Sequence, residues 1–155
     1  GAAMNQNVSF GGTPELIHNG GSGGTQWTPT ANAGTWDFGA TGKITISLAN
    51  NNDSATFDDA VTIDMTVYTA ITWLVDLATY NPTQNTMVIE FGLAGVTVGN
   101  SVNIDDYIDT GNFAEQAFAI PKSDLGIDSL TVDEMTITIT RSGVLDHLLN
   151  LMIYK

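Results

Sequence analysis

Apolar and polar residues alternate at every second position in four segments of the chain, which is the pattern of a half-buried β-strand. These segments span residues 43–49, 61–68, 87–91 and 132–140. In the last segment, Met135, Ile137 and Ile139 are expected to face a core, whereas the threonines between them face solvent. β-Branched and aromatic residues are frequent in all four segments. The alternation predicts antiparallel sheets with one buried face.

Further apolar runs add to this set of strands. Buried or closing strands are predicted at residues 71–77, 117–120 and 148–154, with shorter strands at 35–38 and 8–10. A helix is the alternative for the tail, because residues 145–152 are also rich in helix formers. Single helical turns are expected at 104–108 and 122–125. Asn-, Gly- and Pro-containing turns are predicted at 50–53, 81–82, 99–100, 111–112 and 142–143 and separate the runs. About eight strands at this spacing predict an all-β chain folded as an antiparallel jelly-roll β-sandwich.

One domain accounts for most of the chain. Residues 1–3 look like an expression scar and are left out of the fold. Residues 4–24 are expected to form an N-terminal arm that ends in a glycine-rich loop, and residues 25–155 a single β-sandwich. Taken as the native start, Met4 is followed by polar residues and not by an export signal. Assembly into a virus particle that is released by lysis would then carry the protein out of the cell.

The charge of the chain is strongly one-sided. It has 17 acidic residues against 4 lysines and arginines, which gives a formal net charge of −13. Proteins bind nucleic acids and anionic membranes by placing lysine and arginine against phosphates. We therefore expect neither nucleic acid nor membrane as a partner.

Residues with catalytic chemistry are sparse. The chain has no cysteine, so disulfides, thiolate metal sites and cysteine nucleophiles are excluded. His18 and His147 are the two histidines, and no serine lies in a G-x-S-x-G motif. The four glutamates are spread along the chain, whereas glycoside hydrolysis needs two carboxylates that face each other across a cleft. We expect the protein not to be an enzyme.

One acidic cluster has the oxygen ligands that calcium prefers. Asp105, Asp106 and Asp109 lie close together in the sequence and form the candidate for a structural calcium site. They do not match the EF-hand loop. The alternative is that they are solvated turn residues, with Asp105 favouring the start of a short helical turn.

Aromatic residues in predicted loops are candidates for a sugar platform, because flat rings stack on the apolar faces of sugars. Trp27, Tyr80 and Tyr107 are the three candidates for glycan binding. Packing against the edge of the sandwich is the alternative for each of them. Trp36 and Trp73 are assigned to the core.

The segment 111–126, with the sequence GNFAEQAFAIPKSDLG, resembles a strand and turn of galactose-binding-like jelly rolls and of many carbohydrate-binding modules. In it, Pro121 ends the strand by removing a hydrogen-bond donor, and Ser123 and Asp124 can cap the turn. Gly126 allows the reversal of the chain. The resemblance implies a jelly-roll architecture and does not by itself identify a sugar site.

A second resemblance covers more of the chain and leads to a different function. The segments are 17–21 (IHNGG), 27–28, 34–38 (GTWDF) and 98–109 (VGNSVNIDDYID). They are similar to segments of virion proteins of tailed phages, which implies a non-enzymatic structural protein of the virion. It would be a capsid decoration protein or a fibre- or tail-associated domain.

Such a virion protein would assemble with other virion proteins, form a homo-oligomer and attach to cell-surface glycans. The alternative function is a carbohydrate-binding module of a secreted polysaccharide-active enzyme. It would be monomeric and would present aromatic residues on one exposed face.

Overall fold

A computed structural model of the chain describes residues 15–21, 25–39, 44–76, 86–109, 111, 115–140, 143–147 and 151–154. For 47–49, 76, 143–147 and 151–154 it describes the strand pairing alone. The predicted strand at 8–10 lies outside these residues. Among the described residues, no helix is long and apolar enough to cross a membrane.

The described residues form strands joined by turns. The first six strands are β1 (Glu15–His18), β2 (Thr28–Ala33), β3 (Thr35–Asp37), β4 (Ile44–Ala49), β5 (Ser54–Asp64) and β6 (Ala70–Asp76). The remaining strands are β7 (Met87–Leu93), β8 (Val96–Asn103), β9 (Glu115–Pro121), β10 (Thr131–Ile139), β11 (Gly143–His147) and β12 (Leu151–Tyr154). Two short 3-10 helices, η1 (Met65–Val67) and η2 (Ile104–Asp106), follow β5 and β8.

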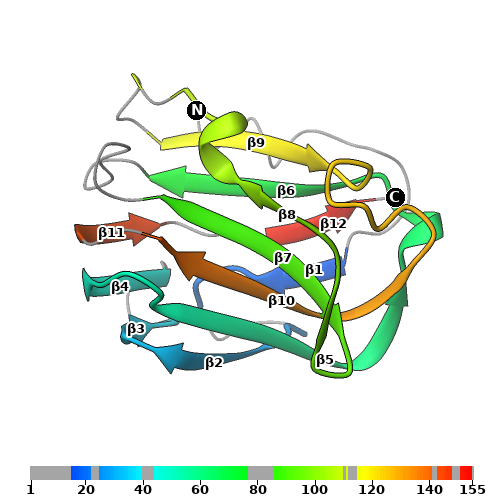
Figure 1. The fold of residues 1–155 in the computed structure, drawn as a ribbon, viewed down its shortest axis with the longest axis horizontal. Coiled ribbons are helices and arrows are strands. Elements are labelled where there is room, and N and C mark those ends of the chain that lie inside the picture. The colour runs from blue at the N-terminus through cyan, green and yellow to red at the C-terminus, as the bar shows by residue number, and fades with distance from the viewer. Residues whose placement is uncertain are drawn as a thin grey trace.

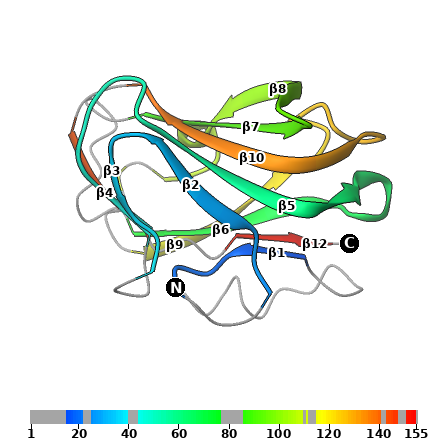
Figure 2. The same ribbon diagram turned by 90° about the horizontal axis from the view of Figure 1, so that it is seen from below.

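The strands form two layers and a third, smaller sheet. One layer is a five-stranded sheet in the order β2-β5-β10-β7-β8, and the other is a four-stranded sheet in the order β1-β12-β6-β9. Figure 2 shows them as the upper and lower layers of the sandwich. The third sheet, in the order β11-β4-β3, lies at one end of the molecule (Figure 1). Neighbouring strands are antiparallel throughout the described pairs, which confirms the predicted jelly-roll β-sandwich.

The core lies between the two layers and is apolar. Trp73 from the four-stranded sheet and Phe57 and Phe91 from the five-stranded sheet are its largest fully buried side chains. On β10, Met135, Ile137 and Ile139 are buried, as the alternation of residues predicted, and their threonine neighbours point away from the core. Burial of apolar surface of this kind provides most of the free energy of folding.

Some predicted elements have other bounds in the structure. The strand predicted at 61–68 begins earlier in the structure, at Ser54, and ends at Asp64. The carboxylate of Asp64 accepts the backbone N–H of Thr66 at 3.0 Å and caps the start of η1. The turn predicted at Gly99 lies within β8, and Gly143 begins β11. The expected helical turn at 104–108 is present as η2.

Candidate functional site

Trp27, one of the three aromatic residues predicted to stack on a sugar, lies in the core. Its side chain is 2% exposed, and its indole Nε1 donates a hydrogen bond to Glu15 Oε1 at 3.1 Å. Its backbone N–H donates to the carbonyl oxygen of Ile17 at 2.9 Å, which holds the residue beside β1. The expectation of an exposed Trp27 is therefore corrected, because its ring is enclosed by the core and has no free face for a sugar.

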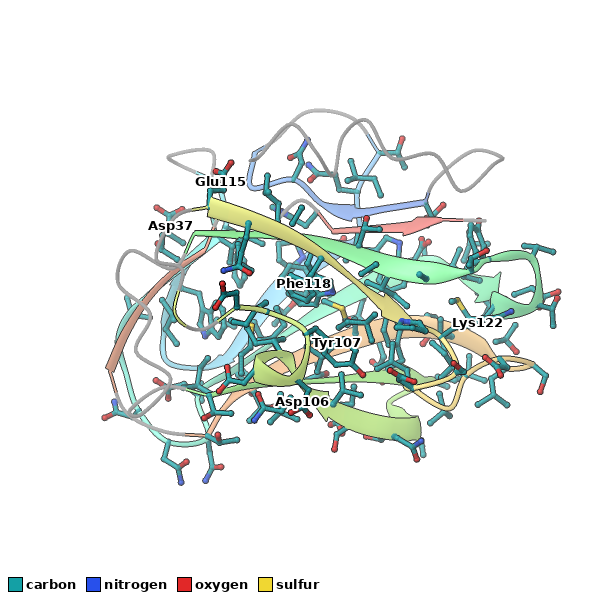
Figure 3. All side chains as sticks on the ribbon, turned by 90° about the horizontal axis from the view of Figure 1, so that it is seen from above. Asp37, Asp106, Tyr107, Glu115, Phe118 and Lys122 are labelled. Atoms are coloured by element: carbon teal, nitrogen blue, oxygen red, sulfur yellow. The ribbon has the colours of Figure 1, made fainter. Side chains whose placement is uncertain are left out.

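Tyr107, the second candidate, is half-buried and lies directly after η2. Its hydroxyl donates a hydrogen bond to Asp124 Oδ2 at 2.7 Å. Burial, together with this carboxylate, raises the pKa of Tyr107 to about 12. Figure 3 shows Tyr107 and Phe118 in one strip of the molecule between η2 and β9, and both rings pack partly against the core. The third candidate, Tyr80, lies outside the described residues.

The predicted calcium ligands are not brought together. Asp109 Oδ1 accepts the backbone N–H of Gly111 at 3.0 Å, and the backbone N–H of Asp105 donates to Asn103 Oδ1 at 3.0 Å. Asp106 is exposed. Within the described part of the chain, no three His, Asp or Glu side chains converge to hold a metal ion. The structure thus favours the alternative that these residues stabilise a turn.

A polar surface covers the outer side of the five-stranded sheet. Because side chains alternate along a strand, those that alternate with core residues in 54–58 of β5, 88–90 of β7 and 134–138 of β10 point outward. All of the outward side chains except that of Val88 carry a hydroxyl, an amide or a carboxylate. We call this surface the hydroxyl face; it consists of Thr28, Thr30, Asn32, Ser54, Thr56, Asp58, Val88, Glu90, Glu134, Thr136 and Thr138.

Hydrogen bonds link the hydroxyl face from strand to strand. Asn32 Nδ2 on β2 donates to Thr56 Oγ1 on β5 at 2.8 Å, and the hydroxyls of Thr56 and Thr136 lie 3.0 Å apart. Thr136 is the cross-strand partner of Glu90 on β7. Glu90 Oε1 accepts the hydroxyl of Thr97 on β8 at 3.4 Å. The result is one continuous row of polar groups across the sheet.

Two carboxyl groups of the hydroxyl face contact each other directly. Glu134 on β10 is the cross-strand partner of Asp58 on β5. Burial, a hydrogen bond from this neighbour and its negative charge raise the pKa of Glu134 above its ordinary value.

A stacked aromatic pair lies beyond the end of β2. Trp36 and Phe38 are half-buried, with ring centroids 5.8 Å apart and ring planes 6° from parallel. Trp36 Nε1 donates to the carbonyl oxygen of Ala33, the last residue of β2, at 2.9 Å. Trp36, which the sequence assigned to the core, packs against the core with partial exposure. Of the described tryptophans it is the one with solvent-accessible ring surface.

The sequence indicated single outward threonines but not the hydroxyl face. The signal was present as two T-x-T motifs, at residues 28–30 and 136–138. Their meaning depends on the register that places Thr30, Thr56 and Thr136 in one row. This register comes from pairing between strands that are far apart in the sequence, so the pattern within one strand does not reveal it.

Three solved structures share this fold over nearly the whole chain. The xylan-binding module CBM15 has a TM-score of 0.55 at 13% identity and covers 93% of this chain and 97% of its own. The low-affinity xylan-binding module CBM86 from the gut symbiont Roseburia intestinalis has a TM-score of 0.54 at 13% identity, with coverage of 92% and 95%. The family 11 carbohydrate-binding module from Clostridium thermocellum, solved with a β-1,3-1,4-mixed-linked tetrasaccharide, has a TM-score of 0.54 at 14% identity, with coverage of 91% and 95%.

At these identities the similarity establishes the fold. No family model matches the chain, and no curated protein matches its sequence. The three are carbohydrate-binding modules, and nothing in these comparisons shows a similarity to phage virion proteins. The virion role remains a prediction from the sequence.

Proposed function

We propose that the protein is a carbohydrate-binding module that holds a glycan chain on its hydroxyl face. The observation that carries this proposal is the row of polar groups through Thr30, Thr56, Thr136 and Glu90, on a fold shared with xylan- and glucan-binding modules. Sugars present hydroxyl groups that both donate and accept hydrogen bonds. A row of threonine hydroxyls matches this chemistry, and the carboxylate of Glu90 is a strong acceptor for sugar hydroxyls.

The spacing of the row suits a polymer that crosses the strands. Neighbouring strands lie about 4.8 Å apart, which is close to the advance of one pyranose ring along an extended glycan. Each ring of such a chain would meet the polar group of one strand. The row extends over β2, β5, β10 and β7, so it offers contacts to about four rings.

The affinity follows from the kind of contact. Each hydrogen bond made in exchange for water contributes about 1 kcal/mol, so four of them give a dissociation constant of about 1 mM. Trp36, on β3 beyond the end of β2, would add stacking energy for a glycan chain long enough to reach it. We therefore expect weak binding that increases with the length of the glycan.

Isothermal titration calorimetry with xylan and mixed-linkage β-glucan oligosaccharides tests the proposal. In the double variant Thr56→Val/Thr136→Val, two hydroxyls of the row are replaced by methyl groups of the same shape. Binding should weaken about thirtyfold, because two hydrogen bonds of about 1 kcal/mol each are lost. The control is Thr69→Val, which changes an exposed threonine between η1 and β6, away from the five-stranded sheet's outer side.

Two results would contradict the proposal in different ways. If no oligosaccharide of either class binds the wild type, the function itself is wrong. If Tyr107→Ala abolishes binding while the Thr56→Val/Thr136→Val variant binds normally, the glycan site lies at the strip between η2 and β9 and not on the hydroxyl face.

A further inference from the structure

The hydroxyl face has an acidic side and a neutral side. The pairing of β5 with β10 places outward side chains in three successive cross-strand pairs. In order along the strands, these pairs are Asp58–Glu134, Thr56–Thr136 and Ser54–Thr138. The middle pair belongs to the row of polar groups to which the glycan is assigned. This row is thus flanked by two carboxyl groups on one side and by two hydroxyl groups on the other.

The side chain of Glu134 extends the acidic side over β7. It lies over Gly92, its cross-strand partner, where an added Cβ would come within 2.7 Å of Glu134 Cγ. Gly92 follows Glu90 by two residues on the same strand, and two residues of a strand span about 6.7 Å. The carboxyl group of Glu134 therefore takes the place of a β7 side chain beside Glu90. The β7 end of the row carries two glutamates.

The charges of the hydroxyl face are all negative. Asp58, Glu90 and Glu134 carry carboxyl groups, and the other residues that define the face, all within the described part of the chain, are threonine, serine, asparagine and valine. The acidic pair lies about 6.7 Å from the row, which is inside the screening length of about 10 Å at 0.1 M ionic strength. The formal net charge of the whole chain, −13, has the same sign. A negatively charged ligand group on the row would be repelled.

We propose that the hydroxyl face selects neutral glycans, and that Asp58 and Glu134 exclude glycans that carry carboxylates. This inference rests on the proposed function, because it names the class of glycan that the same site accepts. A neutral sugar donates its hydroxyl hydrogens to carboxylates, which are strong acceptors. A uronic acid brings a second negative charge to the same place, and like charges brought together at a binding surface lower the affinity.

Calorimetric titration with oligosaccharides matched in length tests the inference at pH 8, well above the ordinary pKa of carboxyl groups. A neutral xylo-oligosaccharide is compared with one that has a glucuronic acid branch. A mixed-linkage β-glucan oligosaccharide is compared with one in which a single glucose is oxidised to glucuronic acid. At an ionic strength of about 20 mM, the acidic member of each pair that binds should bind about fivefold more weakly, which corresponds to about 1 kcal/mol.

Salt separates the effect of charge from the effect of shape. At an ionic strength of about 1 M, the screening length falls to about 3 Å, and the two members of a pair should bind within about twofold of each other. A steric effect of the acidic group would be the same at both salt concentrations. This comparison uses the wild type alone, so it does not depend on how a variant folds.

The double variant Asp58→Asn/Glu134→Gln assigns the selection to these residues. It removes two charges and keeps the shape of both side chains. The ratio of the two dissociation constants at low salt should fall from about five to about two. The matched control is Glu115→Gln/Asp128→Asn, which removes two charges at the start of β9 and in the turn before β10. Its ratio should stay near that of the wild type.

The possible outcomes distinguish this inference from the proposed function. If no neutral oligosaccharide of either class binds, the proposed function fails and the inference fails with it. If neutral and acidic members bind equally at low salt, or differ equally at both salt concentrations, glycan binding stands and selection by charge is overturned. An equal fall of the ratio in the Glu115→Gln/Asp128→Asn control would show that net charge is responsible, and would overturn the role of Asp58 and Glu134.

Discussion

The side chain of Lys122 ties three turns of the chain together, and its removal gives a prediction that can be worked out from the structure. Its Nζ donates hydrogen bonds to the carbonyl oxygens of Met65 at 2.9 Å and Asp128 at 3.2 Å, with Thr66 at 3.5 Å. Lys122 follows the last residue of β9 (Figure 3). Its ammonium group therefore connects the end of β9 to η1 and to the turn before β10. The carbonyl oxygen of Met65 also accepts the backbone N–H of Tyr68 at 3.2 Å.

The variant Lys122→Met keeps the aliphatic stem and removes the ammonium group. Hydrogen bonds from a charged donor contribute about 1.5–3 kcal/mol each when buried. The bond to Asp128 is exposed and that to Met65 is only part-buried, so water can replace part of what the ammonium group supplies. Counting the two shorter bonds at about 1 kcal/mol each, we expect the free energy of unfolding to fall by about 2 kcal/mol. In a chain of 155 residues this lowers the melting temperature by about 4–8 °C.

Urea unfolding followed by tryptophan fluorescence measures the loss of free energy directly, and calorimetry gives the melting temperature. Ser123→Ala is the control, because it changes an exposed neighbour in the same turn. A loss below about 0.5 kcal/mol for Lys122→Met, or an equal loss for Ser123→Ala, would refute the role given to the ammonium group.

Three further predictions follow from single residues. Gly99→Ala should lower the free energy of unfolding in urea by about 2–4 kcal/mol, because Gly99 has φ +72° and the new Cβ would clash with the carbonyl oxygen of Leu125. A loss below about 1 kcal/mol would show that the backbone of Gly99 is not tightly packed against Leu125. Burial lowers the pKa of His18, so stability should fall as the pH drops below about 6.5, and an NMR titration in which His18 protonates at or above 6.5 would contradict this. Burial and Asp124 raise the pKa of Tyr107 to about 12, above the usual tyrosine value of about 10. An absorbance step near pH 12 should therefore belong to Tyr107, and Tyr107→Phe should remove it.

The alternation of residues was sufficient to predict the interior strands of the sandwich. β10 and β7 have an apolar residue at every second position and pack one face on the core, so the pattern and the structure agree. β2 was not predicted, because it is an edge strand with Pro29 and mostly exposed small or polar residues, and its place is fixed by pairing with β5. β8 was read as a turn because of Gly99, although this residue lies within a strand and makes its close approach to Leu125 there.

The site was harder to predict than the fold for a physical reason. Whether an aromatic residue such as Trp27 is exposed depends on the layers above and below it, and these are set by contacts between distant segments. Trp27 lies between glycine-rich and threonine-rich sequence, which suggested an exposed loop. In the structure its ring is buried in the core, and its indole N–H donates a hydrogen bond to Glu15. The hydroxyl face likewise exists because the register aligns threonines of three different strands.

The most direct test of glycan binding on the hydroxyl face is an NMR titration of the ¹⁵N-labelled protein with a xylan or mixed-linkage β-glucan oligosaccharide. Binding there should change the amide shifts of β2, β5, β10 and β7 together, with the largest changes around Thr56, Thr136 and Glu90. Shift changes confined to η2 and β9, or no changes at millimolar glycan, would contradict binding on the hydroxyl face.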